Sequence, residues 1–262
     1  MGNVKIVLVF LFFITFISCG KSHKERALQK YNLAAGLCEK GDSLAALQEL
    51  DSIPVLFPEA FEAIGNAKYL GKKINSEMLF RKQDQLDKIT GQLTELEKLF
   101  VIEKTEFDRF AQFIPKAQNF GPRWNTSYLQ VHLNELGDYY ISSNYYGSEW
   151  LNHLALRVCD GAFQAKTDTV ELKSPNNYHS DFMSTHWEKV SYKEGKDNGV
   201  IQFIADNANK NLKAAFVGKR TYSIVLEQRD KQAIRDALSL SNLLKSKTQL
   251  EKDIKAFQQK VK

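Results

Sequence analysis

Cysteine, proline and histidine are scarce in this sequence, and their scarcity excludes several classes of protein. The 262 residues include three cysteines, five prolines and five histidines. Three cysteines are too few for a disulfide scaffold, and their spacing does not fit a zinc site. The 36 Lys and Arg residues are mixed along the chain with 31 Asp and Glu residues, so no basic block indicates binding to nucleic acid. With 43% hydrophobic residues, the chain still has enough apolar material for a packed core.

Recognisable catalytic motifs are also missing. The sequence contains no G-x-S-x-G, no P-loop and no Rossmann glycine pattern. Four histidines lie between residues 119 and 229, at spacings that fit neither a zinc-binding helix nor an H-x-H strand: His132, His153, His179 and His186. We therefore expect a non-enzymatic protein with no cofactor and no metal. On the polar side of its strand, His132 is expected to be a solvated imidazole.

The first residues have the pattern of a secretion signal. Lys5 precedes an apolar run, Ile6–Ile17, that is interrupted only by Thr15. Twelve helical residues span about 18 Å, which is well short of the ~30 Å hydrocarbon core of a bilayer. The run is therefore typical of a signal-peptide core and not of a transmembrane helix.

The end of this run, Phe16-Ile17-Ser18-Cys19-Gly20, resembles the lipobox of bacterial lipoproteins. The resemblance implies that residues 1–18 are removed as a signal peptide and that Cys19 is acylated, with palmitate among its chains, and becomes the new N-terminus. It also implies a chain anchored by lipid to the cell membrane or the outer membrane, facing the periplasm or the surface. Several acyl chains would give durable anchoring. The alternative is an ordinary secretory signal that happens to end near a cysteine.

Residues 19–74 form the next predicted region. Ser22 and Glu25 have the spacing of a capping box, which predicts the start of a helix. The segment 33–58 resembles one tetratricopeptide (TPR) motif through the following residues: Leu33, Ala34, Leu37, Gly41, Asp42, Ala46, Leu50, Ile53 and Pro58. The resemblance implies a hairpin of two helices that cross closely at Ala34 and Ala46. Pro54 departs from the motif and is expected to end the second helix about a turn early. Another helix is expected to begin near Pro58.

Two later segments have the seven-residue spacing of a coiled coil. In residues 75–118 the apolar rows are Leu79, Leu86, Leu93, Phe100 and Phe107, with Ile89, Leu96 and Phe110. In residues 230–262 the rows are Leu243, Leu250 and Phe257, with Leu240, Ile254 and Val261, and Asp230 is the expected N-cap. We predict that the two helices pair with each other as an antiparallel stalk. A parallel dimer formed by two chains is the alternative.

Between the stalk helices, residues 119–229 are predicted to be rich in β-structure. Apolar and polar residues alternate in 128–134, 154–158 and 222–226, and Val200–Ile204 is a more buried strand candidate. Turn residues separate these runs at 137–138, 160–161, 175–177 and 197–199. The expected strands are antiparallel, in a sandwich or a bent sheet. The predicted fold is therefore α+β: a TPR-like hairpin, a long antiparallel coiled-coil stalk and a β-rich head inserted between the stalk helices.

These regions suggest an interaction or scaffold protein that is anchored to the membrane and binds another envelope protein, with no role for nucleic acid. The alternative is a lipoprotein that binds a glycan or a peptide through aromatic residues of the head, for which Tyr145, Tyr146 and Trp150 are the candidate ligand-binding residues. The same rings could instead fill the core, because alternation turns half of them inward. Cys38 and Cys159 are expected to be buried thiols without a disulfide, because the stalk would separate them.

Overall fold

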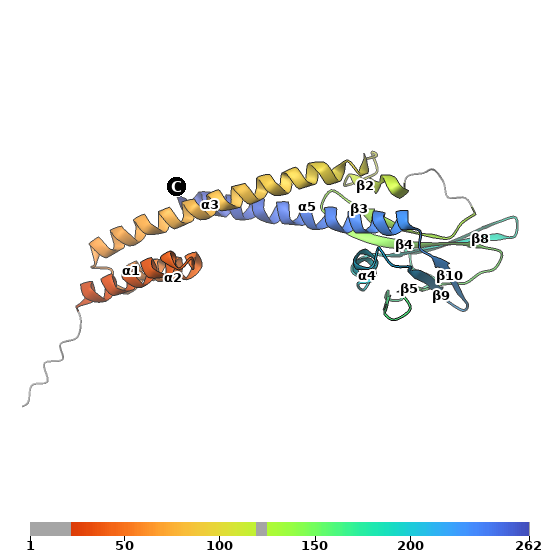
Figure 1. Cartoon of the computed structure of the whole chain (residues 1–262), viewed down its shortest axis with the longest axis horizontal. Helices are drawn as coiled ribbons and strands as arrows, with labels where there is room; N and C mark the ends of the chain where they lie inside the picture. The colour runs from red at the N-terminus through yellow and green to blue at the C-terminus, as the bar shows by residue number, and fades with distance from the viewer. Residues whose placement is uncertain (1–21, 119–124, 262) are drawn as a thin grey trace, which may run out of the picture. The chain divides into compact units, whose positions relative to one another are not determined.

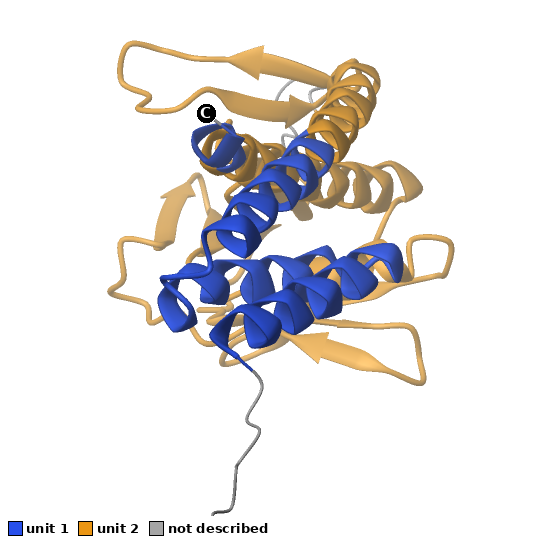
Figure 2. Ribbon diagram, turned by 90° about the vertical axis from the view of Figure 1, so that its left-hand side faces the viewer, with its two compact units in different colours: residues 1–79, 257–262 blue, residues 80–256 orange. Residues whose placement is uncertain are grey.

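The computed structural model describes residues 22–118 and 125–261, so the predicted signal peptide and Cys19 lie outside the described residues. Within that part, the chain is a mixed α+β protein with five α-helices and antiparallel sheets (Figure 1). It divides into two compact units (Figure 2). The first comprises residues 1–79 and 257–262, and the second comprises residues 80–256. Each unit has its own hydrophobic core.

The first unit begins with two helices joined by a short turn, α1 (His23–Glu39) and α2 (Ser43–Leu56). The predicted capping box is confirmed, because Ser22 Oγ accepts from Glu25 N at 3.3 Å and Glu25 Oε2 accepts from Ser22 N at 2.9 Å. Gly41 makes the turn with a φ of 85°, in the left-handed region that favours glycine. Asp42 then caps α2 by accepting from Ala45 N at 3.1 Å.

Small residues let the helices of the first unit pack closely. Ala34 of α1 and Ala46 of α2 are fully buried in one cluster with Ile53 and with residues of the next helix. Leu33 does not follow the TPR assignment, since 54% of it is exposed. The expectation that Pro54 ends α2 early is also wrong. The proline removes one hydrogen bond, and the last turn still closes through Phe57 N and the Ile53 carbonyl at 2.9 Å.

The third helix, α3 (Phe61–Glu97), differs from the predicted first stalk helix, which was placed at 75–118. It begins fourteen residues earlier and ends where an aromatic and β-branched segment starts. That segment forms strand β1 (Phe100–Glu103), which pairs with β2 (Gln112–Pro115). Phe100 is buried against Phe113, with ring centroids 6.1 Å apart, whereas Phe107 is 89% exposed. The apolar row thus leaves the helix after Leu96, and Phe100 is buried in the β1–β2 hairpin instead.

The C-terminal helix α5 (Gln228–Val261) is present as predicted, although it begins two residues earlier. Asp230 is therefore buried in the first turn and is not the N-cap. Within the second unit, α3 and α5 lie side by side and run in opposite directions (Figure 1). Lys82 Nζ donates to Asp253 Oδ2 at 2.7 Å. Further along, Leu93 and Leu240 belong to one buried cluster.

Two four-stranded antiparallel sheets and this helix pair share the core of the second unit. The first sheet has the order β3-β4-β8-β7, with β3 (Tyr128–Leu133), β4 (Tyr139–Gly147), β7 (Asn177–Phe182) and β8 (Thr185–Tyr192). The second has the order β10-β9-β5-β6, with β5 (Ala155–Cys159), β6 (Gln164–Lys166), β9 (Lys213–Val217) and β10 (Thr221–Val225). A single-turn 3-10 helix, η1 (Lys116–Gln118), follows β2. The strict alternation of burial predicted for β3 is confirmed.

The predicted strand Val200–Ile204 is wrong, because this segment forms the helix α4 (Val200–Asp206). Its fully or largely buried residues are Val200, Ile201, Ile204 and Ala205, a spacing of one helical turn. Gly199 precedes the helix with a φ of 80°. The exposed Gln202 therefore marks the solvent side of a helix and is not a break in a strand.

Candidate functional site

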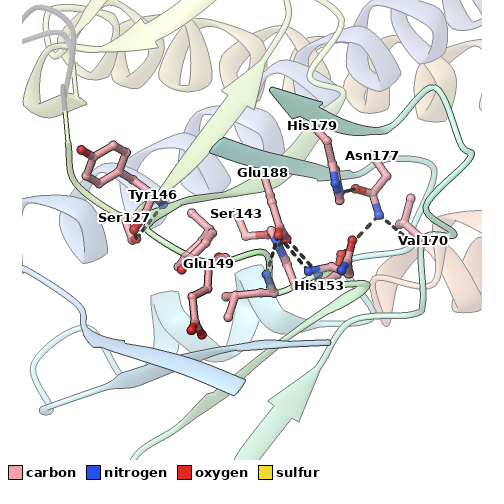
Figure 3. A network of polar contacts seen from close by, with 12 residues as sticks. Ser127, Ser143, Tyr146, Glu149, His153, Val170, Asn177, His179 and Glu188 are labelled. Carbon is pink, nitrogen blue, oxygen red and sulfur yellow. Dashed lines mark hydrogen bonds and ion pairs between the residues drawn. The ribbon is translucent and has the colours of Figure 1, made fainter. Parts of the chain in front are cut away.

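Three buried polar side chains are linked in a row by hydrogen bonds in the second unit (Figure 3). Ser143 lies on β4, Glu188 lies on β8, and His153 comes from the loop before β5. The antiparallel register of β4 and β8 places Ser143 and Glu188 on the same inward side of the sheet. His153 Nε2 is 2.8 Å from Ser143 Oγ, and His153 Nδ1 is 2.6 Å from Glu188 Oε2.

Glu188 also holds the backbone of this loop. Its Oε1 accepts from the N–H groups of Leu151 and Asn152 at 2.7 and 2.8 Å, and its Oε2 accepts from His153 N at 2.9 Å. Burial pushes the pKa of Glu188 up, but the hydrogen bonds from His153 and Asn152 outweigh it and hold the pKa below its ordinary value. Glu188 is therefore a carboxylate that only accepts hydrogen bonds, and Nδ1 of His153 donates the proton in the hydrogen bond between these two side chains.

The order Ser143–His153–Glu188 has the connectivity of a hydrolase triad, but it lacks room for a substrate. The exposed fractions of the three residues are 0%, 0% and 1%. Ser143 Oγ also lies 3.2 Å from the hydroxyl of Tyr192, which is itself fully buried. A nucleophile must reach a carbonyl carbon next to donors for the oxyanion. Because Ser143 is fully buried, a substrate carbonyl cannot reach it in this fold, and the hydrogen bonds of the three residues link the sheet to the loop.

The three predicted ligand-binding residues do not gather on one surface. Tyr145 is only 5% exposed, and its hydroxyl donates to the Glu149 carbonyl at 2.9 Å. An exposed site that includes Tyr145 is therefore wrong, because strand alternation turns this ring inward. Tyr146 points to the opposite side of the sheet. Trp150 is half-buried and stacks on His179, with ring centroids 5.2 Å apart.

The outward side of the first sheet is the more open candidate, and we call it the outer sheet face. The opposite side of the same strands carries core residues such as Leu129, Ile141 and Val190. The outer sheet face consists of Tyr128, Gln130, His132, Tyr140, Ser142, Asn144, Tyr146, Thr185, Trp187, Lys189, Ser191, Tyr178, Ser180 and Phe182. Most of these residues are partly or largely exposed, and only the small side chains of Ser142 and Ser191 are buried.

Two pairs of rings lie apart on this face. His132 stacks on its cross-strand neighbour Tyr140, with centroids 4.3 Å apart and an angle of 7°. Tyr146 contacts its cross-strand neighbour Trp187, with centroids 5.2 Å apart. Between the pairs lie small polar side chains, among which Ser142 Oγ is 3.1 Å from His132 Nε2. Flat rings therefore flank a polar centre.

Positive charge on the outer sheet face comes from Lys189. Lys193 follows the end of β8, and its Nζ lies 4.9 Å from the centre of the Tyr140 ring. Burial lowers the pKa of His132 to about 3, with smaller contributions from both lysines, so the imidazole is neutral. The expectation of a solvated imidazole is wrong, because Tyr140 covers the ring. Burial and the charge of Lys193 lower the pKa of Lys189 as well. Within the four strands, all of which the structure describes, no outward-facing residue is acidic.

One end of the outer sheet face opens into a hollow of about 830 Å³. The hollow is lined by Asp108, Gln112, His132, Leu133, Asn134, Asp138, Tyr139, Tyr140, Lys193, Glu194, Gly195, Asp197 and Lys245. Lys245 of α5 lies over the Tyr139 ring at 5.2 Å. Burial, and next the charge of Asp197, raise the pKa of Tyr139. The hollow thus differs from the rest of the face by carrying charges of both signs.

The sequence did not indicate most of these residues. Ser143 and Glu188 are 45 positions apart and belong to no motif. The alternation of apolar and polar residues does not identify strand β8, because polar Glu188 points inward and aromatic Trp187 points outward, which reverses the usual pattern. The signal that could have located the face is the set of rings at even positions in 140–146, taken together with those of 128–132.

Other features give no further candidate. The thiols of Cys38 and Cys159 are free, and both are partly exposed where burial was expected. Among residues 22–118 and 125–261, no group of His, Cys, Asp and Glu side chains has an arrangement that could hold a metal ion. In the same residues, no helix combines the length and the apolar character needed to span a membrane. Comparisons with protein-family models, curated proteins and solved structures gave no match for this chain.

Proposed function

We propose that this chain is a non-enzymatic interaction protein of a bacterial cell envelope, tethered through lipid on Cys19. The support for the tether is the apolar run Ile6–Ile17 followed by Ser18 and Cys19. In this proposal residues 1–18 are a signal peptide, and the mature chain faces the periplasm or the surface from the cell membrane or the outer membrane. The proposal assigns it a binding role; the triad-like cluster of Ser143, His153 and Glu188 in the described residues is closed to solvent.

The helices serve as spacer and protein-contact elements in this proposal. The close packing of Ala34 and Ala46 supports a TPR-like hairpin, and such hairpins commonly bind other proteins. The ion pair between Lys82 and Asp253 supports an intramolecular antiparallel coiled coil of α3 with α5. A partner protein of the envelope would contact the hairpin, where Val55 of α2 is 79% exposed.

The arrangement of rings on the outer sheet face is the observation that supports a binding role for the second unit. Rings at both ends of a polar centre are a surface suited to a flat or extended ligand. This feature favours the second candidate function, a lipoprotein that binds a glycan or a peptide. The rings involved are then Tyr140, Tyr146 and Trp187, in place of the predicted set that included Tyr145.

The tether is tested by metabolic labelling with radioactive palmitate in cells that express the full chain. We expect label in the native protein and none in Cys19→Ser, which should also leave the membrane fraction. Cys38→Ser is the matched control, since its thiol lies in the described fold and should keep both label and location. Equal labelling of native protein and Cys19→Ser would overturn the tether, the location and the proposed setting together.

The interaction role is tested by cross-linking in intact cells followed by mass spectrometry. We expect cross-links from lysines of residues 22–79 to another envelope protein, and cross-links within one chain between α3 and α5. Cross-links between α3 helices of two chains would instead support the parallel dimer. A chain that yields no cross-link to another envelope protein would contradict the scaffold role.

A further inference from the structure

The outer sheet face has a pattern of rings, small polar groups and charge that specifies a class of ligand. We propose that it binds an acidic polysaccharide, whose chain lies along β4 between the Tyr140 and Tyr146 rings with a carboxylate beside Lys189. This inference rests on the proposed binding role of the second unit and names the ligand of that unit. It needs no reaction and no cofactor.

The spacing of the rings suits a chain of sugars. Tyr140 and Tyr146 are six residues apart on one strand, which is about 20 Å at the usual rise of a strand. This is the length of a short oligosaccharide. The apolar C–H side of a sugar ring packs on an aromatic face, so the Tyr146–Trp187 pair can hold one sugar. At the other end, His132 stacks on Tyr140 and Lys193 lies over the same ring, so this stack bounds the site and does not offer the Tyr140 face to a sugar.

The centre of the face suits hydroxyl groups. Between the two ring pairs, Ser142 and Asn144 on β4 lie beside Gln130 and Ser191 on the neighbouring strands. Asn144 and Gln130 are partly exposed, and their amide groups both donate and accept, as the hydroxyls of a sugar do, whereas Ser142 and Ser191 are buried. A protein interface would instead place large apolar side chains at its centre. The two most central residues here, Ser142 and Ser191, are both small and polar.

The charge of the face points to an anionic ligand with widely spaced charges. Lys189 has no acidic neighbour among the residues of the outer sheet face, and burial and then the charge of Lys193 lower its pKa. A ligand carboxylate would relieve the repulsion between the two lysines through charge-assisted hydrogen bonds. Nucleic acid brings a phosphate with every nucleotide, which two lysines over this length do not match. A polysaccharide with uronic acid units does match.

The hollow at the end of the face sets the direction of the chain. The hollow has four carboxyl side chains, Asp108, Asp138, Glu194 and Asp197, against two lysines, Lys193 and Lys245, so its net charge disfavours a ligand carboxylate. The acidic sugar therefore lies near Lys189, and the sugar that reaches the hollow beyond Tyr140 is neutral or directs its carboxylate away. This arrangement favours a polysaccharide that places one acidic sugar beside Lys189.

Binding is measured by isothermal titration of the full chain with oligosaccharides of polygalacturonate, alginate and hyaluronate, and with maltohexaose as a neutral probe. We expect at least one acidic probe to bind, with an affinity that falls as salt is raised, and maltohexaose to bind more weakly. Absence of binding to all three acidic probes overturns the proposal. So does equal or tighter binding of maltohexaose, poly-glutamate or single-stranded RNA.

Matched variants assign the binding to the face. The double variant Lys189→Gln/Lys193→Gln should lose about tenfold or more in affinity for the acidic probe, since it removes the charge-assisted contact of Lys189 and the second positive charge near it. Lys166→Gln/Lys213→Gln, on exposed positions of the other sheet, is the control and should bind as the native chain does. An equal loss in both double variants would show non-specific attraction and overturn the assignment.

A ring variant separates stacking from folding. Trp187→Ala should weaken binding about tenfold, whereas Trp187→Phe should restore most of it, with both variants showing native circular dichroism. If Trp187→Ala folds and binds normally, the face is not the site. These results do not depend on Cys19, because loss of palmitate labelling would remove the tether and leave the titration unchanged. Failure of glycan binding would leave the tether and the helical contacts standing.

Discussion

Glu188 receives four hydrogen bonds and connects two parts of the chain that are far apart in sequence. Its strand, β8, belongs to the first sheet, and the loop that it holds leads into β5 of the second sheet. A fully buried carboxylate is stable only when its partners replace the water that it has lost. Here three backbone N–H groups and His153 do so, which makes Glu188 the residue with the largest expected effect on stability.

Glu188→Gln should destabilise the fold by about 3 kcal/mol or more at neutral pH, because an amide presents an N–H group to donors that need an acceptor. Urea unfolding of the full chain, followed by circular dichroism, measures the difference. Glu227→Gln is the control, since Glu227 is an exposed carboxylate next to Arg229 and should change stability by less than about 0.5 kcal/mol. Native-like stability of Glu188→Gln would show that the carboxylate charge is dispensable.

The pH dependence of the same pair follows from the sign of the shift. The pKa of Glu188 is lowered in the folded state, so its contribution is complete above the ordinary value of 4.5 and is lost as pH falls through the folded pKa. The difference in unfolding free energy between native protein and Glu188→Gln should therefore shrink below about pH 4.5. A difference that stays constant to lower pH would contradict the assigned shift. Comparing the two proteins cancels the titration of groups that do not contact residue 188.

Gly218 allows the same loop to approach the second sheet. A Cβ atom at this position would lie 2.5 Å from the carbonyl oxygens of Leu151 and Asn152, which are backbone atoms and cannot rotate away. Gly218→Ala should destabilise the fold by about 1–3 kcal/mol in thermal or urea unfolding. Gly91→Ala, in exposed α3 with open space around it, should instead stabilise by up to about 1 kcal/mol. Two changes of the same sign would contradict the close approach.

At the scale of elements, the sequence predicted structure where local pattern and tertiary contacts agree. The alternation in 128–133 and the capping box at Ser22 are both present in the fold. The end of α3 could not be read in the same way, because neither proline nor glycine marks it and Phe100 continues the heptad row. What ends the helix is the pairing of β1 with β2, a contact between segments that the sequence pattern does not connect.

The pairing of α3 with α5 has a direct electrostatic test. The hydrogen bond from Lys82, and next that from Gln249, hold the pKa of Asp253 below its ordinary value. Lys82→Met should therefore raise the pKa of Asp253, as measured by carbon NMR of the carboxyl group during a pH titration. Lys88→Met is the control, since Lys88 pairs with Asp84 on its own helix and should leave Asp253 unchanged. An Asp253 pKa that is unchanged in Lys82→Met would contradict the pairing of α3 with α5.

On the scale of the whole molecule, composition and periodicity were enough to predict an α+β chain but not its candidate site. The outer sheet face is assembled from four strands, and Tyr140 meets His132 only through the register of β3 with β4. The register of a strand pair depends on which side of each strand is buried. Which side is buried depends in turn on how all the strands and helices pack together in the core. The aromatic cluster around residues 139–150 was visible in the sequence, but its division into the inward Tyr145 and the outward Tyr146 required the registered sheet.

The two units have separate cores, and this predicts that damage to one is not transmitted fully to the other. Ile53 is buried only among residues of the first unit, and Phe216 only among those of the second. Ile53→Ala should remove about 2–5 kcal/mol and speed amide hydrogen exchange in α1 and α2, while protection in β3–β5 stays near native. Phe216→Ala should give the reverse pattern in the same experiment. If either variant accelerates exchange equally throughout the described chain, α3 and α5, which run through both units, couple them into one cooperative fold.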